Sequence, residues 1–289
     1  MLASMGVSVS MLASGSRGNC ALVSSASTKI LVDAGISCRE TFKRMKSLDE
    51  DPHSLSAILI THEHCDHIYG LATLSKRLRI PVFMTGGTYQ TWQRSMRDEN
   101  GVKPKLEKFE RFESGHSFQV GDIAVKPFTI PHDAADPVGF TFRAEGIKVG
   151  LATDLGYIPL SVRDHLRGCD VLIMESNHDL EMLRVGPYPW SVKQRVMSRV
   201  GHLSNVALAD FFTSDCSGGE RTPPSLPGAE RVTLRRAESA DFLCICDLEA
   251  LDLATRLLTK LPPCRHGSDA RAEKRQRRGL RHGNRVRIP

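Results

Sequence analysis

The stretch THEHCDHIYGL, residues 61–71, places three histidines and two acids at positions 62–67. Neutral imidazoles and carboxylates are the usual ligands for zinc and similar divalent cations. The apolar run AILIT (57–61) precedes the histidines and is typical of a buried strand. We therefore expect a metal site at the point where this strand ends, and a plain cluster of surface histidines is the alternative.

The spacing H-x-H-x-D-H predicts two neighbouring cation sites. Alternate side chains of an extended backbone share a face, so His62 and His64 can reach one ion together. Asp66 and His67 follow as the chain turns into the segment IYGLATLSKRL, which we expect to be helical. From that turn they are expected to reach a second ion close to the first.

The composition favours a folded protein in a reducing compartment. A chain of 289 residues with 40% hydrophobic content can bury a core. Its eight cysteines are scattered and include no C-x-x-C pair, which favours free thiols and a cytoplasmic location. The N-terminal segment has no positive n-region, and no apolar run reaches the roughly 18–20 residues of a membrane span. We expect no signal peptide and no membrane association.

The net charge of +6 is concentrated at one end of the chain. Residues 265–289 contain nine lysines and arginines against two acids, so they carry +7 and leave −1 for residues 1–264. The tail is therefore either a solvated appendage or an arm that contacts nucleic acid. The remaining chain is close to neutral.

The composition and hydrophobic pattern of the sequence change near residue 215 and predict two regions. Residues 1–215 alternate short β-branched runs with amphipathic stretches, which is an α/β pattern. Residues 216–289 contain a linker-like stretch, one helix at about 247–260 and a basic tail expected to be disordered. We expect this second region to pack poorly against the first. The predicted strands are 8–12, 21–25, 29–35, 57–62, 81–85, 123–130, 139–144, 148–154 and 170–176, and the predicted helices are 37–46, 68–79, 87–97, 159–167 and 189–213.

The motif HxHxDH resembles the signature of the metallo-β-lactamase fold, and the resemblance extends to about Ser214. It implies an αββα sandwich of two mixed β-sheets flanked by helices. It also implies that His132, in IPHDAADPVGF, completes the first ion's ligands with His62 and His64. Asp154, in GLATDLG, would bridge both ions and hold the second with Asp66 and His67. Asp33, in ILVDAG, would be a buried acid near the metal loop.

A finer resemblance is to the YycJ/WalJ family of bacterial exodeoxyribonucleases. The segments LASGSRGN (12–19), HDAADPVGF (132–140), MESNHD (174–179) and VGHLSN (200–205) carry it. GHLS also resembles the segment of ribonuclease J whose histidine contacts the scissile phosphate. The resemblance therefore implies that His202 takes this role, and Asp66 and His202 are the predicted catalytic residues.

Four further residues are candidates for contacts with substrate. Ser14, Ser16 and Asn19 lie in a glycine-punctuated loop whose polar groups can donate to a phosphate, although a plain hairpin turn is the alternative. His178 follows a predicted strand, where it either contacts substrate or caps a turn.

The resemblance implies a hydrolase with two divalent cations, zinc or manganese, that cleaves phosphodiesters of DNA or possibly RNA. Two close cations can lower the pKa of a shared water, so that hydroxide forms near neutral pH and attacks phosphorus. One feature departs from the family: its members have a further histidine ligand some 20–30 residues after GHLS. Here the next histidines are His266 and His282, both in the basic tail.

Three functions remain open from the sequence. The first is a two-metal DNA exonuclease, which SGSRGN and GHLSN favour. The second is a hydrolase of small thioesters or lactones with the same fold. The third is a catalytically impaired relative, which the missing histidine favours. The oligomeric state does not follow from the sequence.

Overall fold

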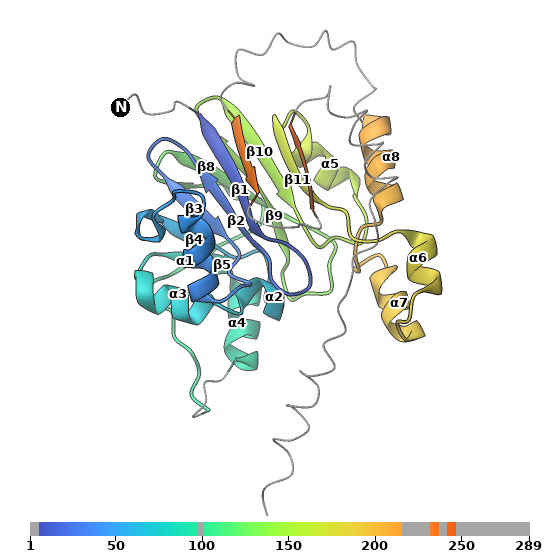
Figure 1. The fold of residues 1–289 in the computed structure, drawn as a ribbon, viewed down its shortest axis with the longest axis horizontal. Coiled ribbons are helices and arrows are strands. Elements are labelled where there is room, and N and C mark those ends of the chain that lie inside the picture. Colours follow the sequence, from blue (N-terminus) through green and yellow to red (C-terminus); the bar gives the residue numbers. More distant parts are fainter. Residues whose placement is uncertain (1–5, 97–100, 216–231, 237–241, 247–289) are drawn as a thin grey trace, which may run out of the picture.

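The molecule consists of two β-sheets packed face to face, with helices on the outer face of each (Figure 1). The computed structural model describes residues 6–96, 101–215, 232–236 and 242–246, and in the last two segments the backbone alone. The predicted α/β sandwich of two mixed sheets is confirmed. The predicted helix at 247–260 and the basic tail lie outside the described residues.

The first sheet has seven strands in the order β12-β1-β2-β3-β4-β5-β6. The pairs β1–β2 and β2–β3 are antiparallel, whereas β1–β12 and the run from β3 to β6 are parallel. Its strands are β1 (Val7–Ala13), β2 (Cys20–Ser24), β3 (Lys29–Val32), β4 (Ala57–Leu59), β5 (Val82–Thr85), β6 (Phe109–Phe112) and β12 (Val232–Arg236).

The second sheet has six strands in the order β13-β11-β10-β9-β8-β7. Its pairs are antiparallel except for β10–β11, which is parallel. Its strands are β7 (Phe118–Val120), β8 (Ile123–Thr129), β9 (Val138–Ala144), β10 (Ile147–Ala152), β11 (Val171–Glu175) and β13 (Phe242–Cys246).

The helices lie on the outer faces of the sheets and in the connections between strands (Figure 1). They are α1 (Cys38–Lys46), the 3-10 helix η1 (Pro52–Ser54), α2 (Cys65–Ile68), α3 (Leu71–Leu78), α4 (Gly86–Ser95), α5 (Leu160–Leu166), α6 (Leu180–Val185), α7 (Trp190–Val196) and α8 (Asn205–Asp215). Helices α1, α3, α4, α5 and α8 cover the outer faces of the sheets, and the remaining helices lie in the connections between strands (Figure 1). Side-chain caps start several of them; for example, Ser37 accepts a hydrogen bond from the N–H of Glu40 at the start of α1. Within the described residues, no helix combines the length and apolar character needed to cross a membrane.

Three hydrophobic clusters hold the layers together. The central cluster lies between the sheets and includes Val23, Phe140 and Val149, all fully buried. A second cluster packs the first sheet against α1, α3 and α4, and a third packs the second sheet against α5 and α8. Strands buried on both faces read as continuous apolar runs rather than alternating ones, as in β2, where every residue is buried.

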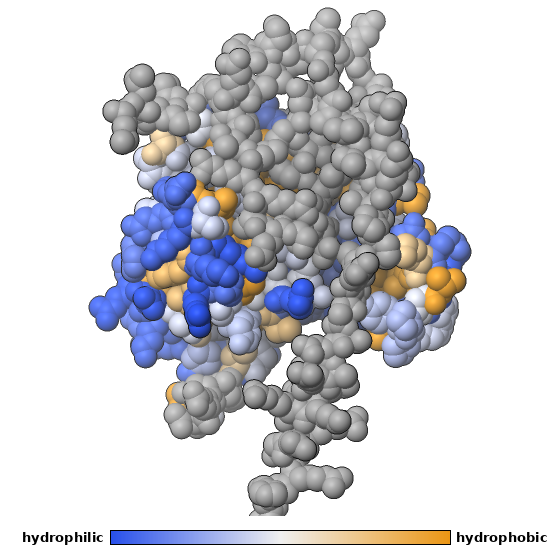
Figure 2. Space-filling view, viewed as in Figure 1, coloured by the Kyte–Doolittle hydropathy of each residue, from blue (hydrophilic) through white to orange (hydrophobic). Residues whose placement is uncertain are grey.

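The helices α6 and α7 project from one side of the molecule, next to α8 (Figure 1). Their exposed hydrophobic side chains produce the orange area at the right of Figure 2. The segment between β11 and α6 and the loop between α7 and α8 both carry predicted site residues, so this projection borders the site. The exposed hydrophobic residues are Met182, Val185, Trp190 and Val192.

The structure differs from the sequence prediction in several elements. Strands β6 and β7 and helix α6 were not predicted, because each is short and has a mixed burial pattern. The predicted helix 189–213 is two helices, α7 and α8, separated by a loop that contains Gly201 and His202. The N–H of His202 donates to the carbonyl of Val196, which ends α7.

Two short segments beyond residue 215 form strands, one at an edge of each sheet. Strand β12 pairs with β1, and β13 pairs with β11. No strand was predicted within residues 216–289, so the prediction lacks these two strands. The prediction that residues 1–215 form the catalytic domain stays a prediction.

Candidate metal centre

The segment that follows β4 presents the first two histidines. Strand β4 ends at Leu59, three residues before the predicted end at His62. The reason is that Thr61 turns away from the sheet: its N–H donates to Oδ1 of Asp33, at 2.9 Å. His62 and His64 therefore extend from a loop, not from one face of a strand. The backbone of His64 is still extended, with φ −63° and ψ 146°.

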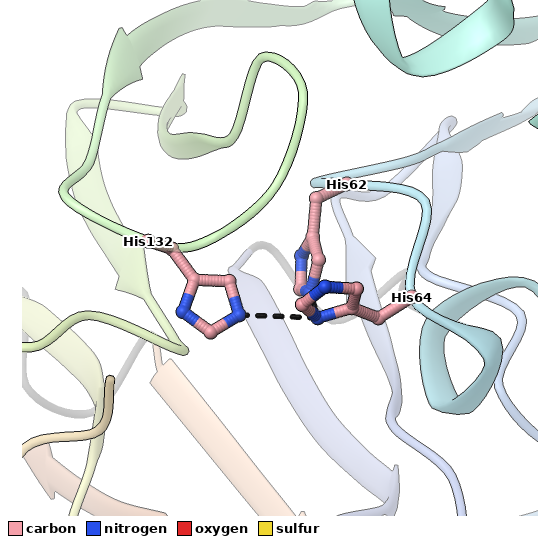
Figure 3. Close-up of side chains that lie close together, drawn as sticks. All are labelled: His62, His64 and His132. Carbon is pink, nitrogen blue, oxygen red and sulfur yellow. Dashed lines mark hydrogen bonds between the residues drawn. The ribbon is translucent and has the colours of Figure 1, made fainter. Parts of the chain in front are cut away.

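His62, His64 and His132 converge on one point, as Figure 3 shows. Nδ1 of His64 lies 3.1 Å from Nε2 of His62 and 3.2 Å from Nε2 of His132. Nitrogens bound to one tetrahedral zinc at 2.0–2.1 Å would be about 3.3 Å apart. The three imidazoles therefore fit a single cation.

In two of these rings, the nitrogen that lies away from the common centre contacts another group of the protein. Nδ1 of His132 donates to the carbonyl of Gly201, at 3.1 Å, which leaves Nε2 to bind a cation. Nδ1 of His62 lies 3.0 Å from Oγ1 of Thr61. Such contacts set the ring orientation of metal ligands. Gly201 itself must be glycine, since a Cβ would lie 2.2 Å from the carbonyl oxygen of Arg195.

A second group of ligand atoms joins the first through His62. Ligand atoms of His62, His67 and Asp154 lie within 4.8 Å of one another. Nε2 of His67 is 3.1 Å from Oδ2 of Asp154 and 3.6 Å from Oδ2 of Asp66. Oδ2 of Asp154 is buried and accepts no hydrogen bond from the described residues. A buried carboxylate oxygen without a donor, beside imidazole nitrogens, fits a divalent cation.

Asp33 fixes His67 from behind. Oδ2 of Asp33 lies 2.8 Å from Nδ1 of His67. The N–H of Thr61 donates to Oδ1 of Asp33, and the hydroxyl of Thr61 donates to both carboxylate oxygens. Asp33 follows β3 with a φ of 61°, a conformation that Asp and Asn adopt more readily than other non-glycine residues. The carboxylate of Asp33 thus connects the end of β3 with the residues that follow β4, and it orients His67, a predicted ligand.

Burial and mutual charge set the pKa values of these groups. Burial lowers the pKa of His62 well below its usual value. Burial would lower the pKa of His67 as well, but the carboxylates of Asp154 and Asp33 raise it well above the usual value. Burial would raise the pKa of Asp154, but the positive charge of His67 holds it below the usual range. Because ligand nitrogens bind metals in their deprotonated form, a cation and a proton would compete for Nε2 of His67.

A third group consists of Asp154, Glu175 and His202. Nδ1 of His202 donates to Oε1 of Glu175 at 2.7 Å and lies 3.4 Å from Oδ1 of Asp154. Burial would lower the pKa of His202, but the hydrogen bond and charge of Glu175 raise it to about 9. Burial raises the pKa of Glu175. This hydrogen bond orients the imidazole of His202, which lines the cavity described next.

A cavity of about 320 Å³ opens over these groups. Of the predicted residues that contact substrate, Ser16, Asn19 and His202 line it, whereas Ser14 and His178 do not. The full lining is Gly15, Ser16, Asn19, His64, Cys65, Asp66, Asp154, Glu175, Asn177, Arg195 and His202.

Asn19 and His178 have contacts that the sequence did not reveal. Nδ2 of Asn19 lies 3.1 Å from Oδ2 of Asp66 and 2.9 Å from Nε2 of His67, so Asn19 touches two predicted ligands. Its Oδ1 accepts the N–H of Gly15, which ties the SGSRGN loop to the metal loop. His178 pairs through its backbone with Ser204, and burial lowers the pKa of its imidazole to about 4. It connects the loops around the cavity without lining it.

Sequence reasoning missed Glu175 and Arg195. Glu175 is the last residue of β11, just as Asp154 follows β10 closely, so the rule that strands end in functional residues applies to it too. It lies in the quoted segment MESNHD but received no role. Arg195 lies on α7, and nothing in the local sequence separates it from other exposed arginines.

Asp33→Asn is expected to lower metal affinity about 10–100-fold while all predicted ligands remain. The amide cannot accept every hydrogen bond that the carboxylate accepts, so His67 loses its orientation. Asn tolerates the positive φ, so the backbone should keep its conformation. Metal affinity is measured by competition with a chromophoric chelator. Asp49→Asn is the matched control, because Asp49 has a φ of 60° and is exposed. Equal affinities for both variants would contradict the role of Asp33.

Comparison with known proteins defines the class. A family model described as the beta-lactamase superfamily domain matches residues 28–213, and the chain belongs to this superfamily of hydrolases. The chain is 40% identical over 215 residues to exodeoxyribonuclease YycJ of Bacillus anthracis, which covers 73% of this chain and 80% of the relative. It is 35% identical over 204 residues to exodeoxyribonuclease WalJ of Streptococcus pneumoniae, with coverage of 71% and 75%. Within the superfamily it is a member of the YycJ/WalJ family, and the predicted resemblance is confirmed.

Among solved structures, the metallo-beta-lactamase fold protein YhfI from Bacillus subtilis aligns with a TM-score of 0.56 at 15% identity. The alignment covers 86% of this chain and 91% of YhfI. At this identity the likeness supports the fold alone.

Proposed function

We propose that the protein is a two-metal phosphodiesterase that degrades DNA as an exonuclease. The three groups of ligand-type residues share members, and this observation carries the proposal. His62 belongs to the first and second groups, and Asp154 belongs to the second and third. Shared members make the groups adjacent, as two cations acting on one phosphate require.

The donor set suggests how two cations would be held. His62, His64 and His132 would hold the first, and Asp66, His67 and Asp154 the second, with Asp154 between them. Imidazole with carboxylate suits zinc and also manganese. When bound, two such ions neutralise charge on a phosphate and lower the pKa of a water so that it attacks near neutral pH.

The surrounding residues position and protonate the substrate in this proposal. Glu175 holds His202 through Nδ1, so the imidazole offers Nε2–H to a phosphate or leaving oxygen. Gly15, Ser16 and Asn177 line other walls of the cavity and carry polar groups. His202 is partly exposed, with 23% of its side chain accessible, and this allows contact with a polymer.

The names of the two relatives favour DNA as substrate over a small thioester or lactone. The impaired alternative rests on the seventh ligand of the family, whose candidates here, His266 and His282, lie outside the described residues. DNA rather than RNA as substrate, a cytoplasmic location and the metal's identity stay predictions.

Removal of metal is expected to abolish the activity. The purified chain should contain two zinc or manganese ions, measured by inductively coupled plasma mass spectrometry, and should shorten end-labelled DNA. Dialysis against a chelator should remove both ions and lower the rate by at least about 10³-fold, because the cations supply most of the charge stabilisation. Re-addition of zinc or manganese should restore the rate.

Each alternative has its own outcome in this experiment. One ion or none, with no hydrolysis of DNA, would favour the impaired relative. Hydrolysis of a thioester or lactone by a chain that leaves DNA intact would favour the small-molecule hydrolase.

A further inference from the structure

Arg195 on α7 reaches the opening of the cavity. It lines the cavity together with His64, Asp66 and His202, while 59% of its side chain is exposed. Of the described residues that line the cavity, Arg195 alone is a lysine or arginine, whereas three are acids. Arg195 is therefore the lysine or arginine that the described lining of the cavity offers to a polyanion.

The guanidinium of Arg195 is held by two bonds to one carboxylate. Nε donates to Oδ2 of Asp133 at 2.6 Å, and Nη2 donates to Oδ1 at 3.2 Å. Asp133 directly follows His132, and its own N–H donates to the carbonyl of Val200. The guanidinium is therefore oriented before substrate arrives, which lowers the cost of fixing a flexible side chain on binding.

The remaining donors of Arg195 have no acceptor among the described residues. A guanidinium carries five N–H groups, and Asp133 uses two of them, so three are left. Two on adjacent nitrogens match the geometry of two phosphate oxygens. Such a donor pair at a cavity opening can bind a phosphate, and a DNA strand offers phosphates.

The position of Asp133 determines which phosphate this would be. Oδ1 of Asp133 lies 3.5 Å from Nε2 of His132 and 3.9 Å from Nε2 of His64. The carboxylate thus stands between the imidazoles and the guanidinium. A phosphate bound at these imidazoles would be separated from Arg195 by this carboxylate, so Arg195 is placed for the neighbouring phosphate of a strand rather than for the same one.

We propose that Arg195 binds the phosphate of the DNA strand adjacent to the one that is cleaved, with Asp133 as its positioning residue. This inference rests on the proposed function. Such a contact contributes equally to substrate and transition state, so it lowers KM and leaves kcat nearly unchanged.

The test compares Arg195→Gln with Arg184→Gln on a single-stranded oligonucleotide. Arg184 is the matched control, because it is equally exposed, at 60%, and is also paired with an acid, Glu181, at 2.7 Å, but lines no part of the cavity. Arg195→Gln should raise KM about 10-fold and change kcat less than about 3-fold, as expected for one charged hydrogen bond. It should also reduce the slope of log KM against log salt concentration by about 0.7, the value for one phosphate contact on a single strand.

Two outcomes would overturn the proposal. KM and salt slope equal to those of Arg184→Gln would show that Arg195 does not bind the strand. A fall in kcat at unchanged KM would place Arg195 on the scissile phosphate. If the wild-type chain does not cleave DNA, the proposed function fails, and binding of the same oligonucleotide by fluorescence anisotropy then applies the salt-slope criterion to Arg195 on its own.

Discussion

Asp154→Asn is expected to abolish metal-dependent hydrolysis, by about 10³-fold or more, while the protein stays folded. Asp154 belongs to two of the three groups of ligand atoms, and its Oδ2 is buried beside His67. Replacing that oxygen's negative charge with a neutral amide weakens both proposed cation sites at once. Activity is followed on end-labelled DNA, and metal content is measured on the same preparation.

Asn is the substitution of choice because Asp154 has a φ of 55°. Asn adopts the left-handed region readily, whereas Ala would add backbone strain to the loss of the ligand. Asp49→Asn again serves as the control, since it makes the same change at an exposed residue with a φ of 60°. Retention of two ions and full activity in Asp154→Asn would mean that Asp154 does not bridge the cations.

His132→Ala is expected to lower affinity for the first cation by more than the 10–100-fold that is typical of residues behind the ligands. Its Nε2 lies 3.2 Å from Nδ1 of His64, and its Nδ1 is anchored on Gly201, so no neighbouring side chain can take its place without moving that loop. We expect one ion or none in the purified variant, and no detectable exonuclease activity. Metal content and circular dichroism of the variant are the measurements.

His116→Ala is the control for this variant, because His116 is exposed and does not line the cavity. A His132→Ala protein that is folded and still binds two ions would remove His132 from the ligand set. A variant that fails to fold is recognised by its circular dichroism, and His132→Gln then tests the same nitrogen with a larger polar side chain.

Much of the fold is predictable because its strands are short, apolar and bounded by turns. All nine strands expected from such runs are present, and the departures are at their ends. Strand β4 shows why its predicted end is wrong. The chain leaves the sheet at Thr61 because the N–H of Thr61 donates to Asp33, 28 positions earlier. No periodicity within residues 57–62 contains that contact.

The sequence by itself determined the identity of the ligand-type residues, since His62, His64, Asp66 and His67 lie in one turn and their chemistry is local. Resemblance added His132 and Asp154. Only the tertiary structure decided the partners of these residues, such as Glu175 with His202, 27 positions apart, and Asp133 with Arg195, 62 positions apart. The physical reason is that a side chain's type depends on its own atoms, whereas its orientation, pKa and remaining donors depend on groups that only folding brings into contact.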